Sequence, residues 1–186
     1  MALISFAIVG KNNEPLFMKE FRDESATDAI PEAELFGLTV STGNTDGFSK
    51  RAKECSLRQQ FILHSALDRF EELAGPPPGF GWREPGSTGT DAMWVGLLCP
   101  VEEMRVYGYM STTKVKFLAV VEDLMPSQLI QHNVVDKEVK KLMIMIHQLY
   151  IEYTLNPFSK IGDVKISSPK FDESVLECVS QFNKAL

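Results

Sequence analysis

The chain has 186 residues, 44% of them hydrophobic, a formal net charge of −6 and three cysteines. A chain of this length can form one domain, residues 1–186, without a metal or disulfide to hold it together. The acidic balance argues against nucleic acid as a partner, because phosphate backbones are bound by basic faces. Cys55, Cys99 and Cys178 form no CxxC pair and the chain has no N-glycosylation sequon, which indicates a reducing compartment.

The first apolar run, Ala2–Val9, has no basic residue before it and stops at a polar turn, so we predict a strand rather than a signal peptide. No stretch approaches the roughly 20 apolar residues that cross a bilayer. We therefore expect a soluble protein that reaches membranes only through partners. A second strand, Leu16–Phe21, follows the turn formers of "GKNNEP" and completes a hairpin. Residues 22–56 then lose periodicity, which predicts a loop insertion.

A helix is predicted after this insertion, because apolar residues recur every three or four positions up to a Gly-Pro-Pro-Pro stop. The expected buried stripe is Leu57, Phe61, His64, Leu67, Phe70 and Ala74. A second, Gly/Pro-rich insertion occupies residues 75–92. Three successive strands are predicted next, at Met93–Cys99, Met104–Met110 and Lys114–Val121.

The last of these strands changes character along its length. Lys114 and Lys116 alternate with apolar neighbours, whereas Leu118–Val121 is apolar on both faces. We expect one end of this strand to face solvent and the other to lie between helices on both sides of the sheet. The link Ser111–Thr113 has no Gly or Asn for a tight turn, so a loop of roughly three to five residues is predicted.

Two more helices are predicted at the C-terminal end of the chain. Asp136 can cap the first, which ends at Asn156-Pro157. Its expected inward stripe is Val139, Leu142, Met143, Ile146, Tyr150 and Tyr153. Ser168 can cap the second, with Pro169 at its first position and Phe171, Val175, Val179 and Phe182 inward. The order β-β-α-β-β-β-α-α predicts an α+β fold: a five-stranded antiparallel sheet with one helix on one face and two on the other.

Few residues suggest catalysis. A thiol enzyme would need Cys99 beside His64, His132 or His147, but Cys99 ends an apolar strand, where a small buried side chain is expected. His64 falls on the predicted helix stripe and is expected to be a core residue. The tracts "STGNTDG" and "PGSTGTD" lack the Gly-Lys-Ser/Thr ending of a phosphate loop, and no residues have metal-ligand spacing. We therefore predict no catalytic residue, cofactor or metal.

One short motif has two interpretations. Asn156-Pro157-Phe158 resembles a tripeptide bound by certain endocytic adaptor domains. It also follows a predicted helix directly, where Asn and then Pro form an ordinary stop, and that interpretation is favoured.

Four separated blocks match one family pattern in order: "AIVGKNNEPLFMKEF", "QFILHSALDRFEE", "WVGLLCPVEEMRVYGYMSTTKVKFLAVVED" and "HQLYIEYTLNPF" with "ISSPKFDESV". They resemble the sedlin family of subunits of the TRAPP vesicle-tethering complex. The third block is most similar to the sedlin-like branch, whereas the first two are at least as similar to the branch of sedlin itself, so the resemblance leaves the branch open. The resemblance implies the longin, or profilin-like, fold. It also implies a non-enzymatic adaptor in an assembly that acts as a guanine-nucleotide exchange factor for a Rab GTPase, with the exchange centre formed by other subunits.

The resemblance also implies partner-contact residues. In "HSALD" the family places an acid after the Leu, here Asp68, on a helix that carries subunit contacts. The two insertions, at about 22–56 and 75–92, depart from the family's shorter links, and Phe80 and Trp82 in the second are aromatics of the kind that anchor interfaces. The expected partners are other TRAPP subunits, and the expected location is the cytoplasmic side of ER–Golgi and Golgi membranes. The alternative is a longin regulatory domain that binds a SNARE or a small GTPase outside TRAPP.

Overall fold

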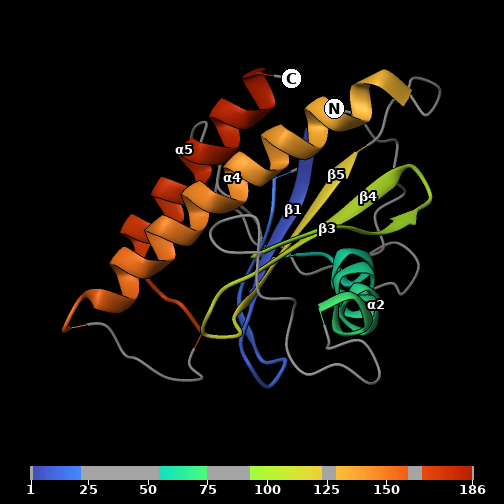
Figure 1. Ribbon diagram of the computed structural model, residues 1–186. Helices are drawn as coiled ribbons and strands as arrows, with labels where there is room; N and C mark the ends of the chain where they lie inside the picture. The colour runs from blue at the N-terminus through green and yellow to red at the C-terminus, as the bar shows by residue number, and fades with distance from the viewer. Residues whose placement is uncertain (1, 22–54, 75–92, 123–128, 159–164, 186) are drawn as a thin grey trace, which may run out of the picture.

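Figure 1 shows the computed structural model, which describes residues 2–21, 55–74, 93–122, 129–158 and 165–185. In chain order these residues form β1 (Ala2–Val9), β2 (Pro15–Glu20), α2 (Leu57–Ala74), β3 (Trp94–Val101), β4 (Met104–Met110), β5 (Lys116–Glu122), α4 (Leu129–Leu155) and α5 (Pro169–Ala185). The predicted α+β class and element order are confirmed. Apart from residues 55 and 56, both predicted insertions lie outside the described residues.

The five strands form one antiparallel sheet in the order β2-β1-β5-β4-β3. β1, β5 and β4 lie inside the sheet, and Ala119 of β5 pairs with Phe6 of β1 on one side and Tyr107 of β4 on the other. β1 and β5 are buried along nearly their whole length, as the continuous apolar run of β5 predicted. A sheet of this kind must be covered on both sides.

The helices cover both faces of the sheet, so the fold has three layers with the sheet in the middle. α2 packs on one face of the sheet, and α4 and α5 lie side by side on the other (Figure 1). Each face has its own hydrophobic core. The α2 side is built from residues such as Ala7, Leu67, Phe70, Val106 and Leu118, and the α4–α5 side from residues such as Phe6, Phe117, Met143, Ile146 and Val175.

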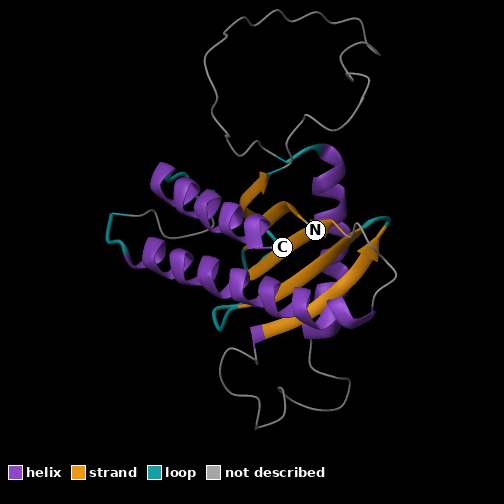
Figure 2. Ribbon diagram, turned by 90° about the horizontal axis from the view of Figure 1, so that it is seen from above, coloured by secondary structure: helices purple, strands orange, loops and turns teal. Residues whose placement is uncertain are grey.

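The chain ends meet beside the sheet. Figure 2 shows the N- and C-terminal ends close together, with α5 packed along β1. The backbone N–H of Leu3 donates to Asn183 Oδ1 at 2.8 Å, which joins the first strand to the last helix. The last helix is thereby joined to an interior strand of the sheet.

The buried stripe of helix α2 differs from the predicted one. Leu67 and Phe70 are buried as expected, but Leu57, Phe61 and His64 point away from the sheet and are exposed. The inward face is instead Gln59, Ile62, Leu63, Ala66, Leu67 and Phe70. A helix on one face of a sheet buries one stripe only, and here the stripe is turned by roughly a third of a turn from the predicted one.

Helix α4 begins at Leu129, seven residues before the predicted cap at Asp136. Val135 is buried one turn before Val139, so the apolar stripe continues through the expected start. The predicted stop is confirmed, since the helix ends at Leu155. The α5 cap is also confirmed: Ser168 Oγ accepts a hydrogen bond from the Phe171 N–H at 3.4 Å.

The loop between β4 and β5 runs from Ser111 to Val115, within the predicted length, and Lys114 has a φ of 68°. The expectation that this end of β5 faces solvent is wrong for Lys116, which is only 8% exposed. Its ammonium donates to Asn13 and Glu71 and lies 5.9 Å from the centre of the Phe70 ring. The end of α2 covers this lysine, and its charge is compensated by partners on other elements.

Candidate functional site

The outward side of α2 carries two large apolar side chains that the sheet does not cover. Leu57 is 80% exposed and Phe61 is 71% exposed. They lie four residues apart, so they are neighbours on one helix face. His64 and Asp68 follow on the same face, one and two turns further along, and both are exposed. We call Leu57, Phe61, His64 and Asp68 the α2 outer face.

A buried polar contact sets the orientation of this helix. Ser5 Oγ of β1 donates to Gln59 Oε1 at 2.9 Å, and Gln59 Nε2 lies 3.8 Å from Met104 Sδ. Ser5 and Gln59 are 0% and 3% exposed, so each needs the other to satisfy its hydrogen-bonding groups. With Gln59 directed into the sheet, Phe61 must point outward.

Close packing fixes the middle of the same helix. Phe70 lies directly over Gly108 of β4, where an added Cβ would stand 2.8 Å from the ring and 3.0 Å from Leu98. The glycine therefore allows the helix to approach the sheet closely. Phe70 is 0% exposed, in contrast to Phe61 two and a half turns earlier.

Ion pairs join both ends of α2 to the sheet. Arg58, in the first turn, pairs with Glu102 in the turn between β3 and β4. Near the other end, Glu71 Oε1 accepts from Asn13 Nδ2 at 2.9 Å and from Lys116 Nζ at 3.0 Å. The Asn13 hydrogen bond, with a further contribution from the Lys116 hydrogen bond and charge, lowers the pKa of Glu71. The α2 outer face is thus presented on a helix held at both ends.

Where the structure describes their side chains, the Cys99 thiol and the histidines considered as its base are not brought together. Cys99 packs on the α2 side of the sheet, whereas His147 lies on the other side, with its Nδ1 3.1 Å from the Tyr109 hydroxyl. Burial raises the pKa of the Cys99 thiol, which disfavours the thiolate. His64 is exposed on α2 and is not the core residue that was predicted. The His132 side chain lies outside the described residues.

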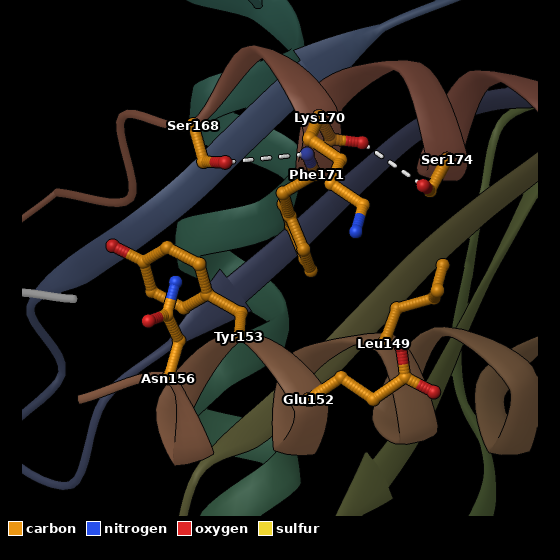
Figure 3. Close-up of a pocket in the computed structure, with 8 residues that line it drawn as sticks. All are labelled: Leu149, Glu152, Tyr153, Asn156, Ser168, Lys170, Phe171 and Ser174. Carbon is orange, nitrogen blue, oxygen red and sulfur yellow. Dashed lines mark hydrogen bonds between the residues drawn. The ribbon is translucent and has the colours of Figure 1, made fainter. Parts of the chain in front are cut away.

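A groove between α4 and α5 is the second surface feature. Figure 3 shows its lining: Leu149, Glu152, Tyr153, Asn156, Ser168, Lys170, Phe171 and Ser174. Its volume is ≈ 100 Å³. Clefts that bind small molecules are larger, roughly 300–1,000 Å³, so this groove is a seam between two helices rather than a ligand site.

Among the described residues, no three His, Cys, Asp or Glu side chains are grouped to hold a metal ion. In the same part of the chain, no helix has the length and apolar character to cross a membrane.

The structure places one of the three predicted contact residues. Asp68 lies on the α2 outer face, two turns beyond the exposed Phe61, while Phe80 and Trp82 lie outside the described residues. The sequence interpretation missed Leu57 and Phe61 as surface residues because it assigned them to the core. A signal was present: Ile62, Ala66 and Phe70 repeat every four residues and define a separate stripe, and one sheet can bury only one of the two.

Comparison with known proteins gives a consistent family. The family model described as Sedlin matches residues 8–181. The chain is 31% identical to the trafficking protein particle complex subunit 2-like protein of Dictyostelium discoideum, over 95% of this chain and 96% of that protein. It is 36% identical to the protein of the same name from Xenopus tropicalis, over 66% and 78%. It is 26% identical to trafficking protein particle complex subunit 20 of Saccharomyces cerevisiae, over 91% and 92%.

Proposed function

Because the chain belongs to the sedlin family, we propose that it is a non-catalytic adaptor subunit of the TRAPP complex. In this role it supports assembly of a Rab guanine-nucleotide exchange factor and vesicle tethering in ER–Golgi and Golgi traffic. Its direct partners are other TRAPP subunits, and it meets the Rab GTPase only through the complex. It is cytoplasmic and peripheral to ER–Golgi and Golgi membranes, which it reaches through these partners.

The α2 outer face is the observation that best supports this proposal. Leu57 and Phe61 are large, adjacent and mostly exposed on a helix whose opposite side is fully packed. Large apolar side chains at the centre of a contact, with charged residues at its rim, are typical of protein interfaces. We assign Leu57 and Phe61 the role of apolar anchors for a neighbouring subunit, with Asp68 at the edge of the contact.

Affinity capture of the tagged full chain from its own cells, followed by mass spectrometry, tests the adaptor role. Recovery of other TRAPP subunits in a fixed ratio at low and moderate salt is the expected result. Recovery of only SNAREs or a small GTPase would replace the proposal with the longin regulatory domain. A well-folded chain that captures no protein would contradict both functions.

Replacing Asp68 tests the edge of the contact. Asp68→Tyr places a bulky ring on the α2 outer face and removes a charge, so we expect weaker capture of the neighbouring TRAPP subunit. Thermal unfolding should stay nearly unchanged because Asp68 is exposed. Glu177→Tyr, at an exposed acid of α5 on the opposite side of the sheet, is the matched control and should capture normally. A loss of stability that parallels the loss of capture would remove the interface role.

Phe80 and Trp82 are proposed as a second contact, specific to this chain's longer link between α2 and β3. Deletion of Pro76–Thr90 should weaken partner capture without abolishing it, because the α2 outer face remains. Unchanged partner affinity after the deletion would dismiss this contact.

A further inference from the structure

The tripeptide Asn156-Pro157-Phe158 follows α4 directly, and all three of its residues are exposed. Phe158 is 94% exposed, whereas Phe6, Phe70 and Phe117 are each 0% exposed. The tripeptide does act as the predicted helix stop. However, Asn and Pro alone are enough to stop a helix, so the stop does not explain the exposed aromatic ring.

Local hydrogen bonds hold the tripeptide in a defined turn. The Asn156 N–H donates to the Tyr153 carbonyl at 3.3 Å, which closes the last turn of the helix. The Phe158 N–H donates to Asn156 Oδ1 at 3.0 Å, so the asparagine side chain bridges over the proline. Pro157 has a fixed φ and no N–H. These constraints direct the Phe158 side chain away from the chain without help from distant contacts.

The base of the turn is firmly packed. The Tyr153 ring lies 5.7 Å from the Phe171 ring of α5. Figure 3 shows Asn156 beside Tyr153 at the edge of the groove between the two helices. Figures 1 and 2 show that the end of α4 projects beyond the sheet, on the side opposite α2. A partner can therefore approach the turn while the α2 outer face is occupied by another protein.

We propose that Asn156-Pro157-Phe158 is a docking motif for an endocytic-type adaptor domain of the class that binds Asn-Pro-Phe tripeptides. The sequence of the motif, its preformed turn and its exposed ring favour this occupant over a neighbouring subunit with a broad contact. A three-residue turn with one aromatic anchor fits a small pocket that takes the ring and contacts the asparagine. Since the turn exists before binding, little conformational entropy is lost on docking. The proposal is independent of the α2 outer face and of membership in a complex.

The test is a titration of the purified full chain with a purified adaptor domain that is first shown to bind a free Asn-Pro-Phe peptide. Isothermal calorimetry should show saturable binding with one site per chain. Phe158→Ala should weaken binding roughly tenfold or more, because it removes the aromatic anchor. Leu155→Ala is the matched control: Leu155 is 75% exposed and directly precedes the tripeptide without belonging to it, and this change should alter affinity less than about twofold.

A second variant separates recognition of the tripeptide from maintenance of the turn. Asn156→Asp keeps a side-chain oxygen that can accept the Phe158 N–H, but it loses the amide nitrogen and adds a charge. Weakened binding with unchanged far-UV circular dichroism would support recognition of the asparagine itself. The proposal is overturned if a domain that binds the free peptide does not bind the chain, or if Leu155→Ala weakens binding as much as Phe158→Ala does.

Discussion

The two phenylalanines of α2 provide a direct test of how this helix is oriented. Phe70 is 0% exposed and packs on Gly108, whereas Phe61 is 71% exposed. Replacing a buried Phe by Ala costs about 3–5 kcal/mol, because both burial and packing are lost. Full burial of such a side chain contributes roughly 1.5–3 kcal/mol, and Phe61 is less than one-third buried, so Phe61→Ala should cost only about 0.5–1 kcal/mol.

Thermal unfolding followed by circular dichroism measures this difference. For a chain of this size each kcal/mol shifts Tm by roughly 2–4 °C, so Phe70→Ala should lower Tm by roughly 6–20 °C and Phe61→Ala by at most about 4 °C. Urea unfolding at 25 °C should give the same order. Equal destabilisation by the two changes would mean that Phe61 is buried and that the α2 outer face, as defined here, is wrong.

Three further predictions concern the core and its pH dependence. Gln59→Ala should cost about 1–3 kcal/mol, because the buried Ser5 hydroxyl loses its acceptor; a urea midpoint equal to that of the unmodified chain would show that Ser5 has another partner. Gly108→Ala should cost about 1–3 kcal/mol, because its new Cβ meets the Phe70 ring; no change in Tm would mean that the helix can move away freely. Burial lowers the pKa of His147, so the unfolded chain binds protons preferentially and stability should fall as pH drops below about 6.5. His147→Gln should reduce this loss of stability. Identical profiles of urea midpoint against pH, from pH 7.5 to 5.5, for the variant and the unmodified chain would contradict this prediction.

The element order could be predicted because its signals are local. The apolar run of β1, the apolar run Leu118–Val121 of β5 and the stop after Leu155 each depend on residues close in sequence. With a sheet apolar on both faces, helices on both sides followed from the need to bury those faces. The largest error in an element's bounds is the start of α4, because Asp136 suggested a cap while Val135 already belonged to the buried stripe.

The orientation of α2 could not be derived in the same way. Gln59 is polar, and its burial depends on Ser5, 54 residues earlier in the chain. Lys116 is covered because it meets Glu71, 45 residues away. Such contacts exist only once the sheet has formed, so a helix with two competing apolar stripes is ambiguous until its neighbours are known. The outward position of Leu57 and Phe61, and hence the candidate site, depends on that orientation.

The capture of TRAPP subunits by outer-face variants tests the central claim most directly. Leu57→Ser/Phe61→Ser removes both apolar anchors and changes no residue of the buried stripe, and Leu155→Ser removes a similarly exposed side chain on α4. Each tagged variant is expressed in the cells from which the protein comes. Quantitative mass spectrometry then gives the amount of TRAPP subunits per captured chain. We predict roughly tenfold or greater loss for the double variant and normal recovery for Leu155→Ser. Equal recovery by the double variant and the unmodified chain would contradict assembly through α2.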